Sequence, residues 1–113
     1  MEYEVRFKVE TDLRLLQVFN FPNPFSTETA FTFHLTGLRM PDEVTLRIYT
    51  IAGRMVYERR LLPGEVNIGF NTIPWDGRDQ NGDPVANGVY FYKVSAVQEG
   101  KRVEVVEKLA RVR

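Results

Sequence analysis

The sequence predicts an all-β protein, an antiparallel β-sandwich of about seven strands. Apolar and polar residues alternate with a period of two over most of the chain, and a helical period is nearly absent. Glycine, proline, asparagine and aspartate gather in the gaps between the alternating stretches, where strands must reverse. A chain of 113 residues is the size of one domain with a core of its own.

Seven stretches carry the strand pattern. In residues 3–10, Tyr3, Val5, Phe7 and Val9 share one face and charged residues share the other, which is typical of a half-buried antiparallel strand. Six further stretches are expected to be strands because they alternate and are rich in β-branched and aromatic residues. They are residues 30–36, 43–50, 54–61, 66–73, 88–97 and 101–112. This number and spacing of strands is typical of the Ig-like type of sandwich.

A domain boundary is expected between residues 10 and 20. We expect residues 11–113 to form the Ig-like domain, and residues 1–10 to be a strand that could belong to a preceding domain. The N-terminus lacks the apolar stretch of a signal peptide, and no apolar run approaches the roughly 18 residues of a membrane helix. We therefore expect the sequence to be part of a larger protein and not to insert into a membrane.

The composition disfavours several functions. Fifteen Lys and Arg balance fifteen Asp and Glu, so nucleic acid and anionic membranes are not expected as partners. The chain has no cysteine, and its one histidine, His34, is expected on the solvent side of its strand, without zinc or triad partners. Ser26 and Ser95 lack the context of a nucleophile. We expect no catalytic group and no cofactor.

Residues 76–83, "DGRDQNGD", could be a calcium loop or a tight turn. Aligning Gly82 with the invariant glycine of an EF-hand puts Gly77 and Gly88 at the two positions that need anchoring carboxylates. The pair Asn81-Gly82 is also a common reversal signal between strands. The pattern favours a turn over an irregular calcium loop.

Trp75 and the nearby aromatic residues Phe70, Tyr90, Phe91 and Tyr92 also admit two interpretations. Flat rings on a surface could stack on sugars. Alternatively, Trp75 closes the sandwich core and the tyrosines line one sheet. We favour the second interpretation.

Four motifs occur in order: "NPF" at 23–25, "IYTIAGRMV" at 48–56, "WDGRDQNGDPVANGVYFY" at 75–92 and "EKL" at 107–109. Over residues 18–109 the chain resembles the C-terminal Ig-like domain of bacterial proteins exported by the type IX (Por) secretion system. It also resembles the related Ig-like domain of the flagellar hook-capping protein. The lead-in to "NPF" and the "WDGRD" form look like the C-terminal domain of the gingipain-like peptidase that processes type IX cargo. The chain ends "ARVR", where family members often end on apolar residues.

The motifs also have physical interpretations. The prolines of "PNP" should force an extended entry that leaves Phe21 and Phe25 to plug the end of the sandwich. Gly53 should permit a positive φ in a hairpin, and Gly88 should admit a close crossing of the chain. The resemblance implies a structural or recognition role for Pro22, Asn23, Pro24, Phe25, Gly53, Arg54, Trp75, Asp76, Gly77, Gly88, Val89, Tyr90, Lys108 and Leu109.

The resemblance implies a non-catalytic domain that sorts or docks an exported protein at the type IX machinery of the outer membrane. Its partners would be proteins of that machinery or other domains of the parent protein, which could be a peptidase. It would act between the periplasm and the cell surface, through exposed strand edges and the last hairpin, residues 88–112. Two alternatives are a carbohydrate-binding or adhesion module, with weak carbohydrate contact, and a flagellar hook-cap domain.

Overall fold

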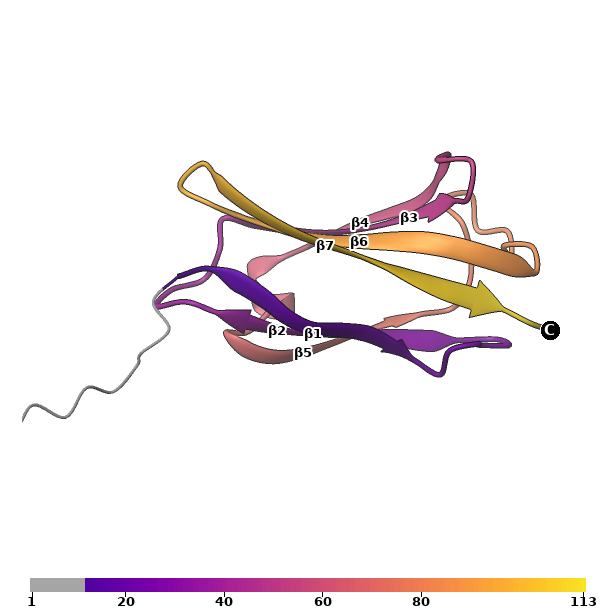
Figure 1. Cartoon of the computed structure of the whole chain (residues 1–113), viewed down its shortest axis with the longest axis horizontal. Helices are drawn as coiled ribbons and strands as arrows, with labels where there is room; N and C mark the ends of the chain where they lie inside the picture. Colours follow the sequence, from indigo (N-terminus) through magenta and orange to yellow (C-terminus); the bar gives the residue numbers. More distant parts are fainter. Residues whose placement is uncertain (1–11) are drawn as a thin grey trace, which may run out of the picture.

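The computed structural model describes residues 12–113 and shows an Ig-like β-sandwich of two antiparallel sheets (Figure 1). The fold class is as the sequence predicts. The elements in chain order are β1 (Arg14–Phe21), β2 (Thr29–Thr36), β3 (Glu43–Thr50), β4 (Met55–Leu61), the short 3₁₀ turn η1 (Pro63–Glu65), β5 (Gly69–Trp75), β6 (Gly88–Gln98) and β7 (Lys101–Arg111).

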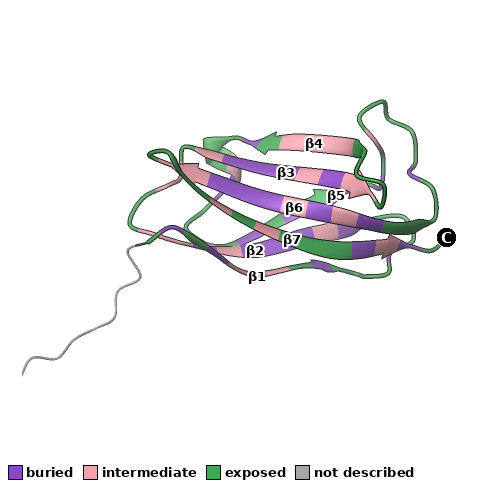
Figure 2. Cartoon of the chain, turned by 45° about the horizontal axis from the view of Figure 1, so that its top comes forward, coloured by how far each residue is buried: buried purple, intermediate pink, exposed green. Residues whose placement is uncertain are grey.

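The two sheets face each other across the core. One sheet has the order β1-β2-β5 and the other the order β4-β3-β6-β7. The hairpin of β6 and β7 forms one side of the larger sheet, and β7 passes beside β1 (Figure 1). Buried residues line the inner faces of both sheets, while the turns at the two ends are exposed (Figure 2).

The predicted strands from residue 30 onward are confirmed with small shifts of their ends. The largest shift is in β5, which begins at Gly69 instead of residue 66. Its buried side chains are Asn71, Ile73 and Trp75, so Phe70 lies on the outer face. The pattern puts Ile68 and Phe70 on one side, and that side is the exposed one.

Strand β1 is not predicted by the sequence pattern. The alternation that buries Leu13 and Leu15 resumes one residue out of phase, so that Asn20 is buried. Between them Gln17 has a positive φ of 51°, and the register with β2 shifts there. A β-bulge of this kind adds one residue and inverts the pattern, which hides the strand from a period-two analysis. The strand expected at residues 3–10 lies outside the described residues.

The core is apolar and rich in aromatic rings. Phe31 and Tyr92 are fully buried, and their rings meet edge to face with centroids 4.7 Å apart. The hydroxyl of Tyr92 has no hydrogen-bond partner among the described residues. Burial, and secondarily the charge of Glu107, raise its pKa above the ordinary tyrosine value. No helix in residues 12–113 is long and apolar enough to cross a membrane.

Candidate functional site

The residues of the four sequence motifs come together at one end of the sandwich, the end at which β7 finishes (Figure 1). We call this the motif end, and it consists of residues 22–25, 51–54, 75–87 and 108–113. Hydrogen bonds, ring contacts and a shared surface hollow connect its segments. The sequence order of the motifs gives no hint of this proximity, because it depends on the sheet topology.

The side chain of Asn23 makes hydrogen bonds to the backbone edge of β7 that a neighbouring strand would otherwise make. Its Nδ2 donates a hydrogen bond to the carbonyl oxygen of Lys108 at 3.2 Å, and its Oδ1 accepts one from the amide of Ala110 at 3.0 Å. Its Nδ2 also lies 3.2 Å from Oδ1 of Asn20, which holds the side chain in place. The peptide bonds before Pro22 and Pro24 are cis.

Phe25 continues this pairing with its backbone. Its amide donates to the carbonyl of Ala110, and its carbonyl accepts from the amide of Val112, both at 2.9 Å. Its side chain is buried, with its ring centroid 5.5 Å from that of Trp75. The expectation that Phe25 plugs the end of the sandwich is confirmed. For Phe21 the expectation is wrong, because 73% of its surface is exposed on the outer side of β1.

Trp75 is part of the core. Its side chain is buried against Phe25, Phe31 and Tyr57, and its Nε1 donates a hydrogen bond to the carbonyl of Arg78 at 2.9 Å. Tyr90 and Tyr92 are buried too, and the hydroxyl of Tyr90 donates to the carbonyl of Ala86 at 2.6 Å. The rings of Trp75, Tyr90 and Tyr92 are buried, so they do not form a flat exposed platform for a sugar.

Arg111 is the central residue of the motif end, and the sequence analysis missed it. Only 3% of its surface is exposed. Its Nε donates to the carbonyl of Ser26, and its Nη1 donates to the carbonyls of Gly77 and Val85, all at 3.0 Å. Its guanidinium carbon lies 5.7 Å from the ring centroid of Phe25. A buried charge is tolerated because these carbonyl oxygens replace its hydration.

Gly77 is where the chain comes closest to this arginine. A Cβ on Gly77 would lie 3.2 Å from Nη1 of Arg111 and 3.1 Å from Cε2 of Phe25, and its φ is +73°. At Gly88, in contrast, a Cβ would meet nothing within 4 Å. The expectation of a close crossing at Gly88 is therefore wrong. Glycine suits position 88 because φ there is +146°, and the close approach between chain segments is at Gly77 instead.

The acidic segment after Trp75 forms a turn that is closed by its own hydrogen bonds. Oδ1 of Asp79 accepts from the backbone amides of Asn81 at 2.9 Å and Asp83 at 3.0 Å, and Gly82 has a positive φ of 88°. Oδ1 of Asp76 accepts from the amide of Arg78 at 3.1 Å. Across residues 12–113, no three acidic, histidine or cysteine side chains are grouped in a way that could hold a metal ion.

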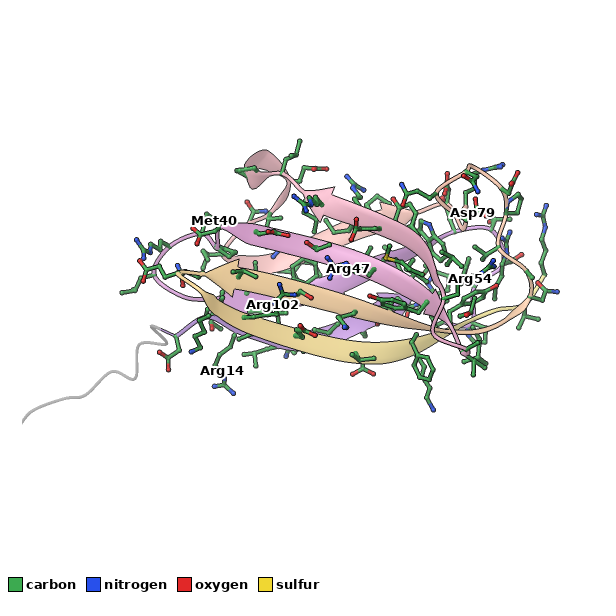
Figure 3. The ribbon with its side chains drawn as sticks, turned by 90° about the horizontal axis from the view of Figure 1, so that it is seen from above. Arg14, Met40, Arg47, Arg54, Asp79 and Arg102 are labelled. Carbon is green, nitrogen blue, oxygen red and sulfur yellow. The ribbon has the colours of Figure 1, made fainter. Side chains whose placement is uncertain are left out.

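The same turn covers the outer edge of β4. The amide of Gln80 donates to the carbonyl of Val56 at 3.0 Å, and its Oε1 accepts from the amide of Glu58 at 2.8 Å. Gly53 has φ 90°, as expected for the hairpin between β3 and β4. Arg54 follows it and helps to line a hollow of about 160 Å³ beside the turn. Figure 3 shows Arg54 and Asp79 at this end of the molecule.

The motif residues of the last hairpin differ in exposure. Val89 is 43% exposed, and Lys108 places Nζ 5.9 Å from the ring centroid of Phe91, whereas Leu109 is buried. The expectation that recognition uses an open strand edge is wrong for residues 108–112. Asn23 and Phe25 already occupy the backbone groups on that edge.

Two antiparallel sheets with a closed motif end define an Ig-like β-sandwich module, a non-catalytic class of fold. The model of the FlgD Ig-like domain family matches residues 22–100. The chain belongs to this family.

Known proteins agree with this assignment. The chain is 37% identical over 62 residues to the basal-body rod modification protein FlgD of Salmonella typhimurium, a match over 55% of this chain and 26% of that protein. The FlgD of Salmonella typhi matches equally well. The chain thus spans about a quarter of the length of these relatives.

Two solved structures share the fold. One is dimeric latent PorU from Porphyromonas gingivalis, with a TM-score of 0.69 and 23% identity over 84% of this chain and 9% of that one. The other is PorZ of the same bacterium, described as an essential surface component of its type IX secretion system. Its TM-score is 0.51, with 21% identity over 85% of this chain and 11% of that one.

Proposed function

We propose that this domain is a non-catalytic docking module that routes or attaches an exported bacterial protein at the type IX machinery of the outer membrane. The observation that carries the proposal is the closure of the motif end, where Asn23 and Phe25 bind the backbone of the last strand and the carbonyl of Gly77 accepts a hydrogen bond from Arg111. A terminal strand fixed in this way offers a partner a rigid surface, which lowers the ordering cost of binding. The proposal is supported by the resemblance of these motifs to those of type IX cargo domains and by the fold that the chain shares with PorU and PorZ.

The recognition surface in this proposal is made of side chains on the last hairpin. Lys108 and Val112 project from the end of β7, and 64% of Val112 is exposed. Because Asn23 and Phe25 cover the backbone edge there, a partner would contact side chains instead of adding a strand. The parent protein, which could be a peptidase, would supply any catalytic activity, and the domain would act between the periplasm and the cell surface.

A reporter experiment tests the proposal. Residues 1–113 are fused to the C-terminus of a periplasmic reporter in a host with a working type IX system, and surface exposure is measured by protease accessibility. We expect the intact fusion to reach the surface. The double variant Lys108→Glu, Val112→Asp should remain periplasmic, and the control Lys101→Glu, at the other end of the hairpin, should behave as the intact fusion. An intact fusion that stays periplasmic would refute autonomous routing.

The flagellar relationship favours a second candidate function. The 37% identity to FlgD and the family match support a role as an Ig-like segment of a hook-capping protein. In a flagellated host, the same fusion would then be recovered with hook and basal-body particles. Recovery there, without surface exposure in the type IX host, would favour this candidate.

A further inference from the structure

We propose that a groove beside the end of β5 binds an extended peptide segment of another protein through an arginine side chain. The groove consists of two hollows that share Glu28 and Pro74 as walls. The first, which we call the acidic hollow, has a volume of about 280 Å³ and is lined by Glu28, Tyr57, Arg59, Pro74, Trp75 and Asp76. The second, the apolar hollow, has a volume of about 210 Å³, and its apolar lining residues are Phe21, Pro22, Ala30 and Pro74.

The pairing of β2 with β5 positions the two carboxylates of the acidic hollow. Thr29 pairs with Trp75, so Glu28 and Asp76 are the next residues along the two antiparallel chains, and both line the same hollow. Tyr57 comes from β4 of the other sheet, and its ring centroid lies 5.7 Å from that of the buried Trp75. The acidic hollow therefore combines aromatic rings with two carboxylates, although these groups come from three separate segments of the chain.

The carboxylates of the acidic hollow are not neutralised within the fold. Glu28 is exposed and makes no hydrogen bond or ion pair with another of residues 12–113. Oδ2 of Asp76 lies 3.8 Å from Nε of Arg78, and an ion pair this long between two exposed side chains stabilises little. The cation that lines the hollow, Arg59, is already ion-paired with Glu65. The acidic hollow thus has an excess of negative charge, which is complementary to a cationic side chain of a partner.

A guanidinium group fits the acidic hollow better than an ammonium group does. It is planar, its N–H groups match both oxygens of a carboxylate, and it stacks on an aromatic ring such as that of Tyr57. Neither hollow reaches the roughly 300–1,000 Å³ of a pocket that encloses a small-molecule ligand. Two small adjoining hollows are better filled by neighbouring side chains of one peptide, so we expect the arginine to belong to a polypeptide.

The apolar hollow accepts the next side chain of the same peptide that points toward the groove. Phe21 is exposed and forms one wall of this hollow, and the rigid ring of Pro74 forms another. In an extended chain, residues i and i+2 point to the same side and lie about 7 Å apart. A segment with an apolar residue two positions from its arginine therefore fills both hollows. The groove is separate from the surface on the last hairpin, and its peptide binding does not depend on the proposed routing role.

A titration with a synthetic peptide tests the proposal. The probe is the capped peptide Leu-Ser-Arg-Ser-Leu, which has a leucine on each side of its arginine and so fits in either chain direction. Fluorescence anisotropy of the labelled peptide with the whole chain should give a Kd below about 1 mM. The unlabelled peptide should change the emission of Trp75, the only tryptophan of the chain, because Trp75 lines the acidic hollow.

A second peptide shows whether the positive charge is recognised. Replacing the arginine by citrulline keeps the shape of the side chain and removes its charge, so binding should weaken by about tenfold or more. The absence of saturable binding to the arginine peptide, or equal binding of the citrulline peptide, would overturn the proposal.

Variants of the chain locate the binding site. Glu28→Gln should weaken binding by about tenfold, and adding Asp76→Asn should bring the loss to about 100-fold. Asparagine at position 76 keeps an oxygen for the amide of Arg78, so the local turn is preserved. Glu107→Gln is the matched control, because Glu107 is an exposed carboxylate without an ion pair on β7. It should bind as the unmodified chain does, and binding that Glu28→Gln leaves unchanged would overturn the proposal.

A double-mutant cycle tests the contribution of the apolar hollow. Replacing both leucines of the peptide by alanine should weaken binding to the unmodified chain by about fivefold. The same replacement should have little effect on binding to the Phe21→Ser variant, because that variant has already lost the apolar contact. Equal losses with both chains would overturn the assignment of the leucine to this hollow. Phe21, Glu28, Asp76 and Glu107 are all exposed, so the melting temperatures of the variants should stay within a few degrees of that of the unmodified chain.

Discussion

Nη1 of Arg111 donates a hydrogen bond to the carbonyl of Gly77 at 3.0 Å and lies 3.2 Å from the place where a Cβ on Gly77 would stand. The two residues are thus hydrogen-bonded and so close together that no side chain fits at position 77. The hydrogen bond requires a small residue at position 77, and it is the second one to this carbonyl, which also accepts from the amide of Val85 at 2.9 Å. Four predictions follow from this end of the molecule and from the core beside it.

Gly77→Ala should destabilise the fold by about 2–4 kcal/mol, because the new methyl would meet Phe25 and Arg111 in addition to the strain of a positive φ. Gly82→Ala is the control. Gly82 also has a positive φ, but a Cβ there would meet nothing within 4 Å. It should cost about 1 kcal/mol. Urea unfolding of both variants measures the difference, and equal losses would contradict the steric part of the argument.

Arg111→Met should lower the free energy of unfolding by about 3–5 kcal/mol. It removes the buried donors for the carbonyls of Ser26, Gly77 and Val85 while keeping most of the side-chain volume. Arg113→Met should change stability by less than about 0.5 kcal/mol, because that side chain is exposed. Similar melting temperatures for the two variants would show that Arg111 does not hold the motif end together.

Tyr92→Phe should leave the free energy of unfolding unchanged or raise it by about 1 kcal/mol, because it removes a buried hydroxyl without a partner. Tyr90→Phe should lower it by about 1 kcal/mol, because it removes the bond to the carbonyl of Ala86. The opposite signs make the pair a sensitive test. A clear loss of stability in Tyr92→Phe would show that its hydroxyl has a partner in solution.

Calcium should not stabilise the domain, because Oδ1 of Asp79 already accepts two backbone amides within its turn. Thermal melts with excess calcium and with a chelator should coincide. An ion at about 100 times its Kd would add roughly 2.7 kcal/mol, which such melts detect easily. Asp79→Ala should lower stability equally in both buffers, since the carboxylate closes the turn in either.

The sequence predicts the sandwich and most of its strands because alternation is a local property that burial of one face imposes. It does not predict β1, since the bulge at Gln17 inverts the alternation within the strand. The same inversion turns Phe19 and Phe21 outward, so their exposure on the outer side of β1 cannot be recognised from the pattern. The alternation groups Phe70 with Ile68 on one side of the strand, but nothing local shows that this side faces solvent.

The candidate site was predictable as a set of motifs but not as an arrangement. The partners of Arg111 lie 85, 34 and 26 residues away along the chain, and no local pattern records such distances. One signal was present: the alternation of β7 places Arg111 on the same side as the buried Leu109. Because arginine is seldom buried, the terminal "ARVR" indicates a polar, exposed end of the strand instead.

The late position of Arg111 bears on when the domain can fold as it is synthesised. The sandwich needs a residue from the end of its last strand to join segments near its beginning and in its middle. A polypeptide that ends before residue 111 therefore has an open slot between Phe25 and Gly77 and lacks the side-chain donor to the carbonyls of Ser26 and Val85. The slot is closed only when residue 111 is present. The motif end can therefore be completed only after every strand of the sandwich has been synthesised.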